Sequence, residues 1–266
     1  MKLLFSEYKS DYSHYIFPYV IWGIPEEGES PAQFFEKGFL PSSRNLDRFY
    51  LCRQIRIHLP EFSPSSENRR ILRKGDGFTY KLVPREQFDF STERRDFCKR
   101  YADQKFGKDV MSFERLDSLM SSPIVSHLLV FNDKDGKEIG FVMLYIEGKT
   151  LVYYYYSFYD LDYFGRNLGM FMMTSAVIFF AEIGYEHLAL GTCYKANALY
   201  KTQFKGAHFF NGFSWSSNLE ELKYLLERDQ GAVAQHLVES EEFCRDFYEG
   251  RLSEIVQRSG FSVPAT

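Results

Sequence analysis

The fold is indicated by residues 151–215, which read LVYYYYSFYDLDYFGRNLGMFMMTSAVIFFAEIGYEHLALGTCYKANALYKTQFKGAHFFNGFSW. Leu151 to Phe158 is apolar and aromatic without polar alternation, as in a strand that is buried on both faces of a sheet. Leu168 to Ile183 is too long for an ordinary strand and precedes Gly184, which predicts a buried helix with a glycine just past its end. His187 to Cys193 and His208 to Phe213 predict two further short strands.

A strand, a helix and a strand of these lengths predict two parallel strands joined by a right-handed crossover. In such units ligands bind beyond the carboxyl ends of the strands, close to the N-terminus of the helix. The predicted site therefore lies around Tyr159 to Gly169 and Cys193 to Tyr200.

The sequence before this stretch predicts more strands. Ile124 to Phe131 and Glu138 to Ile146 flank a polar turn and predict a hairpin, and Phe78 to Val83 predicts another strand. The expected fold class is α+β, with a mixed, mostly antiparallel sheet. We divide the chain into an N-terminal region (1–75), a central domain (76–217) and a helical C-terminal tail (218–266).

The N-terminal region contains two basic elements. Phe49 to Leu59 alternates from Arg53 onward and predicts a half-buried strand with a basic outer face. Ser65 or Ser66 can cap a short helix that follows. The face of this helix carries four cations: Arg69, Arg70, Arg73 and Lys74. A second helix, partly basic, is predicted from Ser91 or Thr92 through Phe106.

Composition excludes several classes of protein. A net charge of −4 over 266 residues does not indicate general nucleic-acid binding, although local basic patches remain possible. The cysteines lie far apart without CxxC spacing, so we expect neither a structural metal site nor a disulfide framework. The N-terminus meets acidic residues too early for a signal peptide, and Leu168 to Ile183 is shorter than the roughly 20 residues that span a bilayer. We therefore expect a soluble cytoplasmic protein.

Two local patterns resemble the GNAT acyltransferase fold, in which a meander leads into a splayed parallel pair. Arg166-Asn167-Leu168-Gly169 is similar to the first part of that family's Q/R-x-x-G-x-G/A loop, whose amides hold a pyrophosphate at a helix start. The last small residue of the pattern is Phe171 here, which weighs against coenzyme A. Asn197-Ala198-Leu199-Tyr200-Lys201, in a stretch compatible with a helix, resembles the family's N-x-x-A-x-x-L-Y-E-K segment. The resemblance implies that Tyr200 protonates the leaving group.

More of the chain resembles the arginyl- and leucyl-tRNA–protein transferase family. Leu168-Gly169, Gly184-Tyr185, Leu190-Gly191 and Leu199-Tyr200-Lys201 with Phe204 follow that family's C-terminal pattern, and Gly38-Phe39, Arg53 to Ile57, Phe62 to Ser65 and Arg69 to Lys74 follow its N-terminal pattern. Phe17-Pro18-Tyr19 stands where the family has a cysteine, and Leu190-Gly191-Thr192-Cys193 replaces L-G-Y-W. We expect a divergent relative.

Each candidate site residue has a functional and a structural interpretation. Tyr200 would act as a general acid, or would only pack on the sheet. Residues Arg166 to Gly169, together with Asn197, would bind the donor, or the loop would be an ordinary strand-to-helix turn. The four cations of the basic helix would contact tRNA phosphates, or would form a solvated helix face.

Three further assignments concern the surroundings of the site. Asp160 and Asp162 would bind a cationic amino group, although loop carboxylates more often cap or face solvent. Cys193 could be a nucleophile, but direct transfer needs none and we expect it to pack. Alternation along the buried strand predicts Tyr153 and Tyr155 on one face of the sheet and Tyr154 and Tyr156 on the other.

The resemblance implies transfer of an amino acid from aminoacyl-tRNA to an amine at a protein N-terminus, without a metal or redox cofactor. The first alternative is a GNAT N-acyltransferase that uses acetyl-CoA or another acyl-CoA. The second is a non-catalytic module that recognises N-terminal residues.

Overall fold

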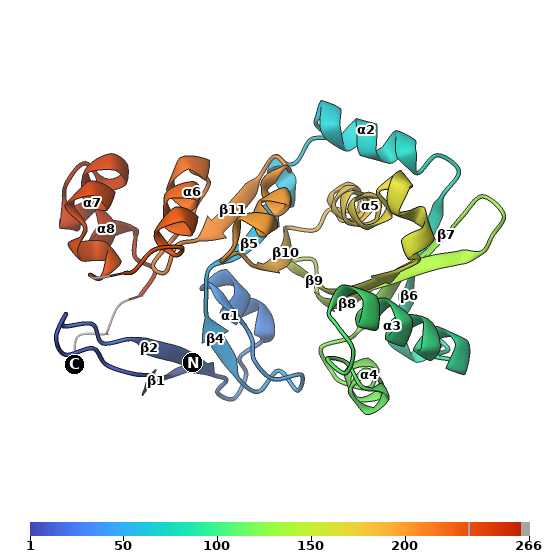
Figure 1. Ribbon diagram of the computed structural model, residues 1–266, viewed down its shortest axis with the longest axis horizontal. Coiled ribbons are helices and arrows are strands. Elements are labelled where there is room, and N and C mark those ends of the chain that lie inside the picture. The colour runs from blue at the N-terminus through green and yellow to red at the C-terminus, as the bar shows by residue number, and fades with distance from the viewer. Residues whose placement is uncertain (234, 262–266) are drawn as a thin grey trace.

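An eight-stranded mixed sheet lies at the centre of the computed structural model, which describes residues 1–233 and 235–261 (Figure 1). Four strands form an antiparallel meander: β6 (Thr79–Pro84), β7 (His127–Asn132), β8 (Glu138–Glu147) and β9 (Leu151–Tyr159). The order continues from β9 through β10 (His187–Thr192), β5 (Gln54–His58), β11 (Ala207–Phe210) and β12 (Trp215–Ser216). The α+β class and the mostly antiparallel sheet are confirmed.

The parallel pair of the sheet is β9 and β10, joined through α5 (Leu168–Glu182) as predicted. Their register covers only Leu151–Tyr153 against His187–Ala189. Both strands run on past this paired segment, and β10 pairs along its other edge with β5 as far as Thr192. The pair is therefore joined at its start and splayed at its carboxyl end. Gly184 follows α5 with a φ of +79°, a conformation that glycine adopts without strain.

A bulge in β9 changes the faces of its tyrosines. Tyr154 pairs with Leu144 and Tyr156 pairs with Met143, so Tyr155 is an extra residue in the strand. Tyr155 and Tyr156 both pack against the same apolar cluster as Tyr153, whereas Tyr154 belongs to the cluster on the opposite face. The predicted alternation is therefore confirmed for Tyr153, Tyr154 and Tyr155 and is wrong at Tyr156, because the inserted residue reverses the register.

Helices cover the two faces of the sheet (Figure 1). The buried helix α5 lies on one face with α2 (Ser66–Lys74), whose N-cap is Ser65 as predicted. The other face is covered by α1 (Pro31–Glu36), α3 (Thr92–Lys105) and α4 (Phe113–Met120). Short 3₁₀ turns complete the connections: η1 (Leu59–Glu61), η2 (Arg85–Gln87), η3 (Leu161–Arg166), η4 (Ala196–Thr202) and η5 (Leu237–Glu239).

The N-terminal region contributes to two sheets. A small antiparallel sheet contains β1 (Lys2–Glu7), β2 (Tyr19–Ile24), β4 (Phe49–Leu51) and β3 (Phe39–Pro41). The strand predicted from Phe49 to Leu59 is broken at Cys52 and Arg53, so that β4 joins the small sheet and β5 joins the large one. The proposed division after residue 75 stays a proposal, with β5 as the element that links its two sides.

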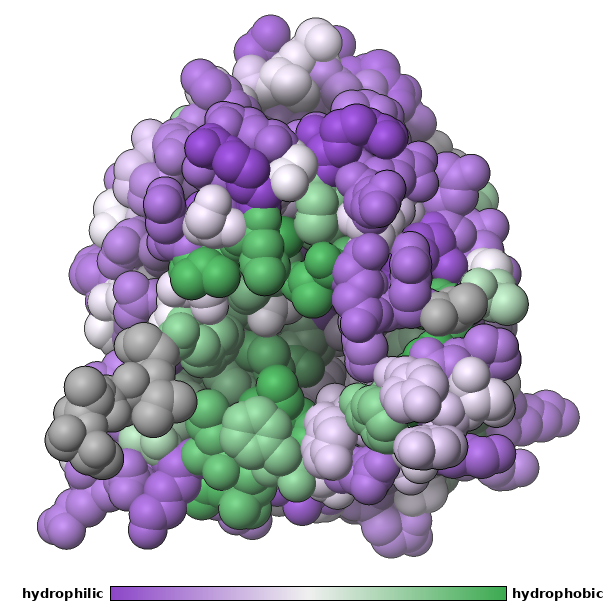
Figure 2. All heavy atoms as spheres, turned by 90° about the vertical axis from the view of Figure 1, so that its left-hand side faces the viewer, coloured by the Kyte–Doolittle hydropathy of each residue, from purple (hydrophilic) through white to green (hydrophobic). Residues whose placement is uncertain are grey.

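The C-terminal tail forms α6 (Leu219–Arg228), α7 (Glu241–Tyr248) and α8 (Leu252–Arg258). Gly250, with a φ of +68°, separates the last two helices. Figure 2 shows an apolar hollow on this end of the molecule, where Phe210, Phe213, Trp215 and Phe261 line a cavity of ≈ 530 Å³. Among the helices of the described ranges, none has the length and apolar character needed to cross a membrane.

A buried polar network attaches this tail to the sheet. Glu221, which is 2% exposed, accepts hydrogen bonds from Asn211, Ser216 and Tyr248 at 2.9, 2.6 and 2.7 Å. Its neighbour Glu220 is exposed and pairs with Lys223.

We expect Glu221→Ala to lower the free energy of unfolding by about 2–3 kcal/mol, because three donors lose a buried acceptor. Glu220→Ala should change it by less than about 0.5 kcal/mol. Urea unfolding of both variants measures the difference, and equal effects would contradict this role.

Candidate active site

A cavity of ≈ 360 Å³ opens where β9 and β10 separate, at the start of α5. Its walls include four tyrosines: Tyr101, Tyr154, Tyr159 and Tyr200. They come from α3, from β9 and from η4. The first residues of α5 and its N-cap complete the opening: Asn167, Leu168, Gly169 and Met170. The cavity thus lies in the region that the sequence predicted.

The N-terminus of α5 offers donors to this cavity. Asn167 adopts a left-handed conformation with a φ of +55°, and its side chain makes no capping hydrogen bond to the helix. The first N–H groups of a helix have no partner within the helix, and the helix dipole places partial positive charge there. An anionic or carbonyl oxygen in the cavity would meet these N–H groups.

The bulge in β9 determines which side chains reach the cavity. Because Tyr155 is inserted, Ser157 and Tyr159 lie with Tyr154 among the lining residues. Tyr159 packs beside Tyr101, with 4.8 Å between the ring centroids. Strict alternation would have placed Tyr156 and Phe158 here instead.

Gly169 serves the packing of Tyr159. A Cβ atom at Gly169 would lie 2.9 Å from the Cζ and hydroxyl oxygen of Tyr159. The ring of Tyr159 therefore fills the space that a side chain at residue 169 would take, and it lies directly on the first turn of α5.

Tyr200 stands at the cavity wall on η4, and 45% of the residue is exposed. Partial burial raises the pKa of Tyr200, and the neighbouring Tyr159 and Cys193 raise it further. Burial also raises the pKa of Tyr154 and of Tyr101. These hydroxyls therefore stay protonated near neutral pH and can donate hydrogen bonds. Lys201 holds η4 in place by donating to the carbonyl of Thr192 at 2.9 Å.

The Arg166 side chain is engaged outside the cavity. Its Nε donates to the carbonyl of Lys74 at 2.8 Å, and its NH2 group donates to the carbonyl of Asp76 at 2.9 Å. The guanidinium also lies 4.0 Å from the ring centroid of Phe78. Arg166 therefore connects the start of α5 to the end of the basic helix α2.

Phe171 supports the same connection. A Cβ atom at Gly75 would lie 2.2 Å from the ring of Phe171, so the bulky residue fills the space that the glycine leaves. Phe171 therefore packs α2 against α5. The GNAT loop pattern has a small residue at this position.

The basic face of α2 is exposed to different degrees. Arg69 donates to the carbonyl of Pro64, and Arg70 pairs with Glu67 at 2.6 Å. Arg73 is exposed and Lys74 is partly exposed. Within residues 1–233 and 235–261, neither Arg73 nor Lys74 forms an ion pair. These two cations lie at the end of α2 that Arg166 attaches to the start of α5.

The remaining predicted residues lie outside the main cavity. Asp160 accepts from the backbone N–H of Asp162 at 3.0 Å and from Lys137 at 2.9 Å, so it caps η3. Both aspartates line a separate cavity of ≈ 290 Å³ that shares Tyr101 and Tyr159 with the first. Asn197 is exposed on η4 and does not line the cavity. Cys193 is fully buried, which favours the packing interpretation.

Comparison with known proteins gives distant relatives. A protein of Leptospira interrogans named aspartate/glutamate leucyltransferase is 26% identical over 171 residues, which are 59% of this chain and 64% of that protein. A protein of the same name from Pseudomonas aeruginosa is 26% identical over 211 residues, which are 72% of this chain and 84% of that protein. The chain thus spans under two thirds of the Leptospira relative's length. No family model matches the chain.

Solved structures give likeness of fold only. L-PGS from Bacillus licheniformis has a TM-score of 0.42 and 15% identity, covering 53% of this chain and 46% of that chain. A GCN5-related N-acetyltransferase from Sphaerobacter thermophilus has a TM-score of 0.35 and 14% identity, covering 66% of this chain and 53% of that chain. Likeness of this degree indicates nothing about a substrate.

The two hydrogen bonds of Arg166 predict a stability effect. Arg166→Met leaves the carbonyls of Lys74 and Asp76 without this donor, so we expect unfolding to become easier by about 2–3 kcal/mol. Arg73→Met, on the exposed face of α2, should change stability by less than about 0.5 kcal/mol. Thermal and urea unfolding measure both. An Arg166→Met protein as stable as the parent would show that the connection contributes nothing.

Proposed function

We propose that this protein is an aminoacyltransferase that moves an amino acid from aminoacyl-tRNA to an amine, at the N-terminus of a protein. The observation that carries the proposal is the cavity at the splayed end of β9 and β10, which combines an uncapped helix N-terminus with tyrosine hydroxyls. The distant relatives named aspartate/glutamate leucyltransferase support the same reaction class.

The reaction would join two substrates in the cavity. The acceptor amine attacks the carbonyl carbon of the aminoacyl ester, so that a C–N bond forms and the C–O bond to the ribose breaks. The nitrogen loses a proton and the ribose oxygen gains one. The ester is already activated, and positioning supplies much of the rate. No metal or redox cofactor is needed for this balance.

Tyr200 is the proposed proton donor to the departing ribose oxygen. Its raised pKa keeps the hydroxyl protonated, and η4 places it in the wall of the cavity that the start of α5 also lines. The N–H groups at the start of α5 would stabilise negative charge on the ester oxygen or bind the terminal nucleotide. Tyr101, Tyr154 and Tyr159 are proposed to form the wall for the terminal adenosine, whose base can stack on aromatic rings.

The basic helix α2 is the proposed contact for tRNA phosphates. Arg73 and Lys74 lie where Arg166 ties α2 to the cavity, so a strand end in the cavity would run past them. An acyl-CoA donor would use the same helix start, but Phe171 occupies the position that is small in the coenzyme A loop pattern. The proposal therefore favours tRNA as the donor.

Removal of the Tyr200 hydroxyl tests the chemistry. Tyr200→Phe should lower kcat by about 100-fold, the size expected for loss of a positioned acid, with little change in KM for aminoacyl-tRNA. Tyr19→Phe is the matched control, because Tyr19 is similarly exposed at 50% and lies outside the cavity. Transfer of labelled amino acids from bulk charged tRNA to a peptide with a free N-terminus is the assay. Full activity of the Tyr200→Phe variant would show that Tyr200 is not the proton donor.

Salt dependence tests the tRNA contact. Each phosphate contact contributes about 0.7–0.9 to the slope of log K against log salt. Replacing Arg73 and Lys74 together by Ala should lower the slope by about 1.5 and weaken tRNA binding at low salt. Lys223→Ala combined with Arg245→Ala, on α6 and α7 at the other end of the molecule, is the control. Filter binding measures both. Stabilisation by acyl-CoA with no binding of charged tRNA would favour the rival N-acyltransferase.

A further inference from the structure

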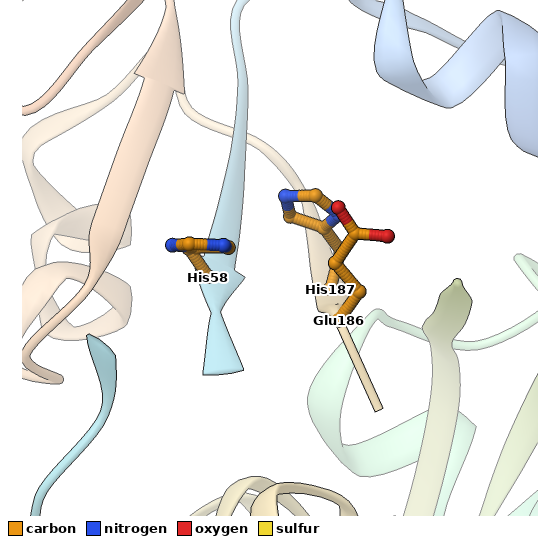
Figure 3. A group of neighbouring side chains, drawn as sticks. All are labelled: His58, Glu186 and His187. Atoms are coloured by element: carbon orange, nitrogen blue, oxygen red, sulfur yellow. The ribbon is translucent and has the colours of Figure 1, made fainter. Parts of the chain in front are cut away.

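A cluster of imidazoles and carboxylates lies at the opposite end of β10 from the active-site cavity. His187 begins β10 and His58 ends β5, and the two residues are register partners in the antiparallel pair. Figure 3 shows their rings side by side, with the Glu186 carboxylate beside the His187 ring. The centroids of the two rings are 5.1 Å apart. Two sheet strands therefore hold the imidazoles in a fixed relation.

The donor atoms of three residues converge. One ligand atom each from His58, Glu186 and His187 lies within 4.8 Å of the other two. Imidazole nitrogen and carboxylate oxygen are ligands of Zn²⁺, which binds at about 2.0–2.1 Å, so that tetrahedral ligand atoms are about 3.4 Å apart. Glu186 is the mobile member, since 52% of its side chain is exposed. Small rotations of this carboxylate and of the two imidazoles would bring the set to bonding distance.

A further carboxylate orients one imidazole. The Oε1 atom of Glu61 lies 2.9 Å from Nδ1 of His58, so the ring can donate its Nδ1–H to Glu61. This hydrogen bond leaves Nε2 of His58 with a free lone pair, as in metal sites where a carboxylate fixes the ligand tautomer. His208 lies on the other side of Glu61, with 3.5 Å between its Nε2 and Glu61 Oε2.

The local charge is compatible with a cation. Arg56 is the neighbouring positive group, but its guanidinium is stacked 3.8 Å above the ring centroid of Trp215. Glu36 and Glu186 lie near enough to interact with it electrostatically. With Glu61 present as well, carboxylates outnumber the guanidinium around the cluster.

We propose that His58, Glu186 and His187 bind a Zn²⁺ ion, with water in the remaining position and Glu61 as the positioning residue for His58. The ion joins the end of β5 to the start of β10, and so links the N-terminal region to the crossover that builds the active-site cavity. The site is separate from that cavity and does not depend on the proposed transfer reaction.

Calorimetric titration of the full chain with ZnCl₂, after treatment with a chelator, tests the proposal. We expect one saturable site. Glu186→Gln, at an exposed position that tolerates the change in folding, and His58→Gln should each weaken Zn²⁺ binding by about 100-fold or more. Glu61→Gln should weaken it by about tenfold, the lower end of the range for residues that orient a ligand. Co²⁺ in place of Zn²⁺ should give a visible spectrum that Glu61→Gln retains and His58→Gln loses.

Two controls define the ligand set. His14→Gln alters an exposed histidine of the N-terminal region and should leave binding unchanged. His208→Gln removes an imidazole from the same cluster and should reduce affinity by less than about tenfold. A loss in His208→Gln equal to that in His58→Gln would overturn the assigned ligands. Absence of saturable binding, or binding that survives both His58→Gln and Glu186→Gln, would overturn the site itself.

Discussion

The short parallel contact between β9 and β10 is the constraint on which the rest of the structure depends. Only three residues of each strand are in register, and β10 then continues with β5 as its partner. A sheet that stayed paired would bury the carboxyl ends of both strands. Because the pair opens instead, the start of α5 and the turn η4 meet in the gap, and the cavity forms between them. The site is a consequence of where the pairing ends.

The bulge at Tyr155 gives that cavity its chemical character. One inserted residue moves Ser157 and Tyr159 to the side of α5, where they join Tyr154. The same insertion leaves Tyr155 and Tyr156 in the core on the opposite face. A run of four tyrosines is therefore divided between packing and the cavity by backbone geometry rather than by its composition.

The sequence predicted helices and strands well where the spacing of apolar residues or a local cap determines them. The helix after Ser65, the hairpin before β9 and the glycine after α5 follow from local signals, and each is present. The bulge, the break at Cys52 and the entry of β5 into the large sheet depend on partners far away in the chain, and no local pattern reveals them. The helix α4 and the sheet formed by β1 and β2 were also not predicted.

Some of the residues around the two candidate sites were beyond sequence prediction for similar reasons. Tyr101 reaches the cavity from α3, a helix that no motif connects to the crossover. His58 and His187 are brought together by the β5–β10 register, so their spacing in the sequence shows no metal-ligand pattern. Asp160, a candidate for binding an amine, accepts a hydrogen bond from the backbone N–H of Asp162, as loop carboxylates commonly do.

The R-x-x-G segment illustrates how a motif can position the parts of a site through contacts within the protein. Arg166 donates hydrogen bonds to two carbonyls at the end of α2, and Gly169 leaves space for the ring of Tyr159. Their combined effect is to fix the start of α5, a tyrosine wall and the cations Arg73 and Lys74 of α2 in one place. Backbone N–H groups and cations so arranged attract a polyanion toward the cavity. The start of α5 and the helix α2 would therefore bind the polyanion, while Arg166 and Gly169 keep these elements in position.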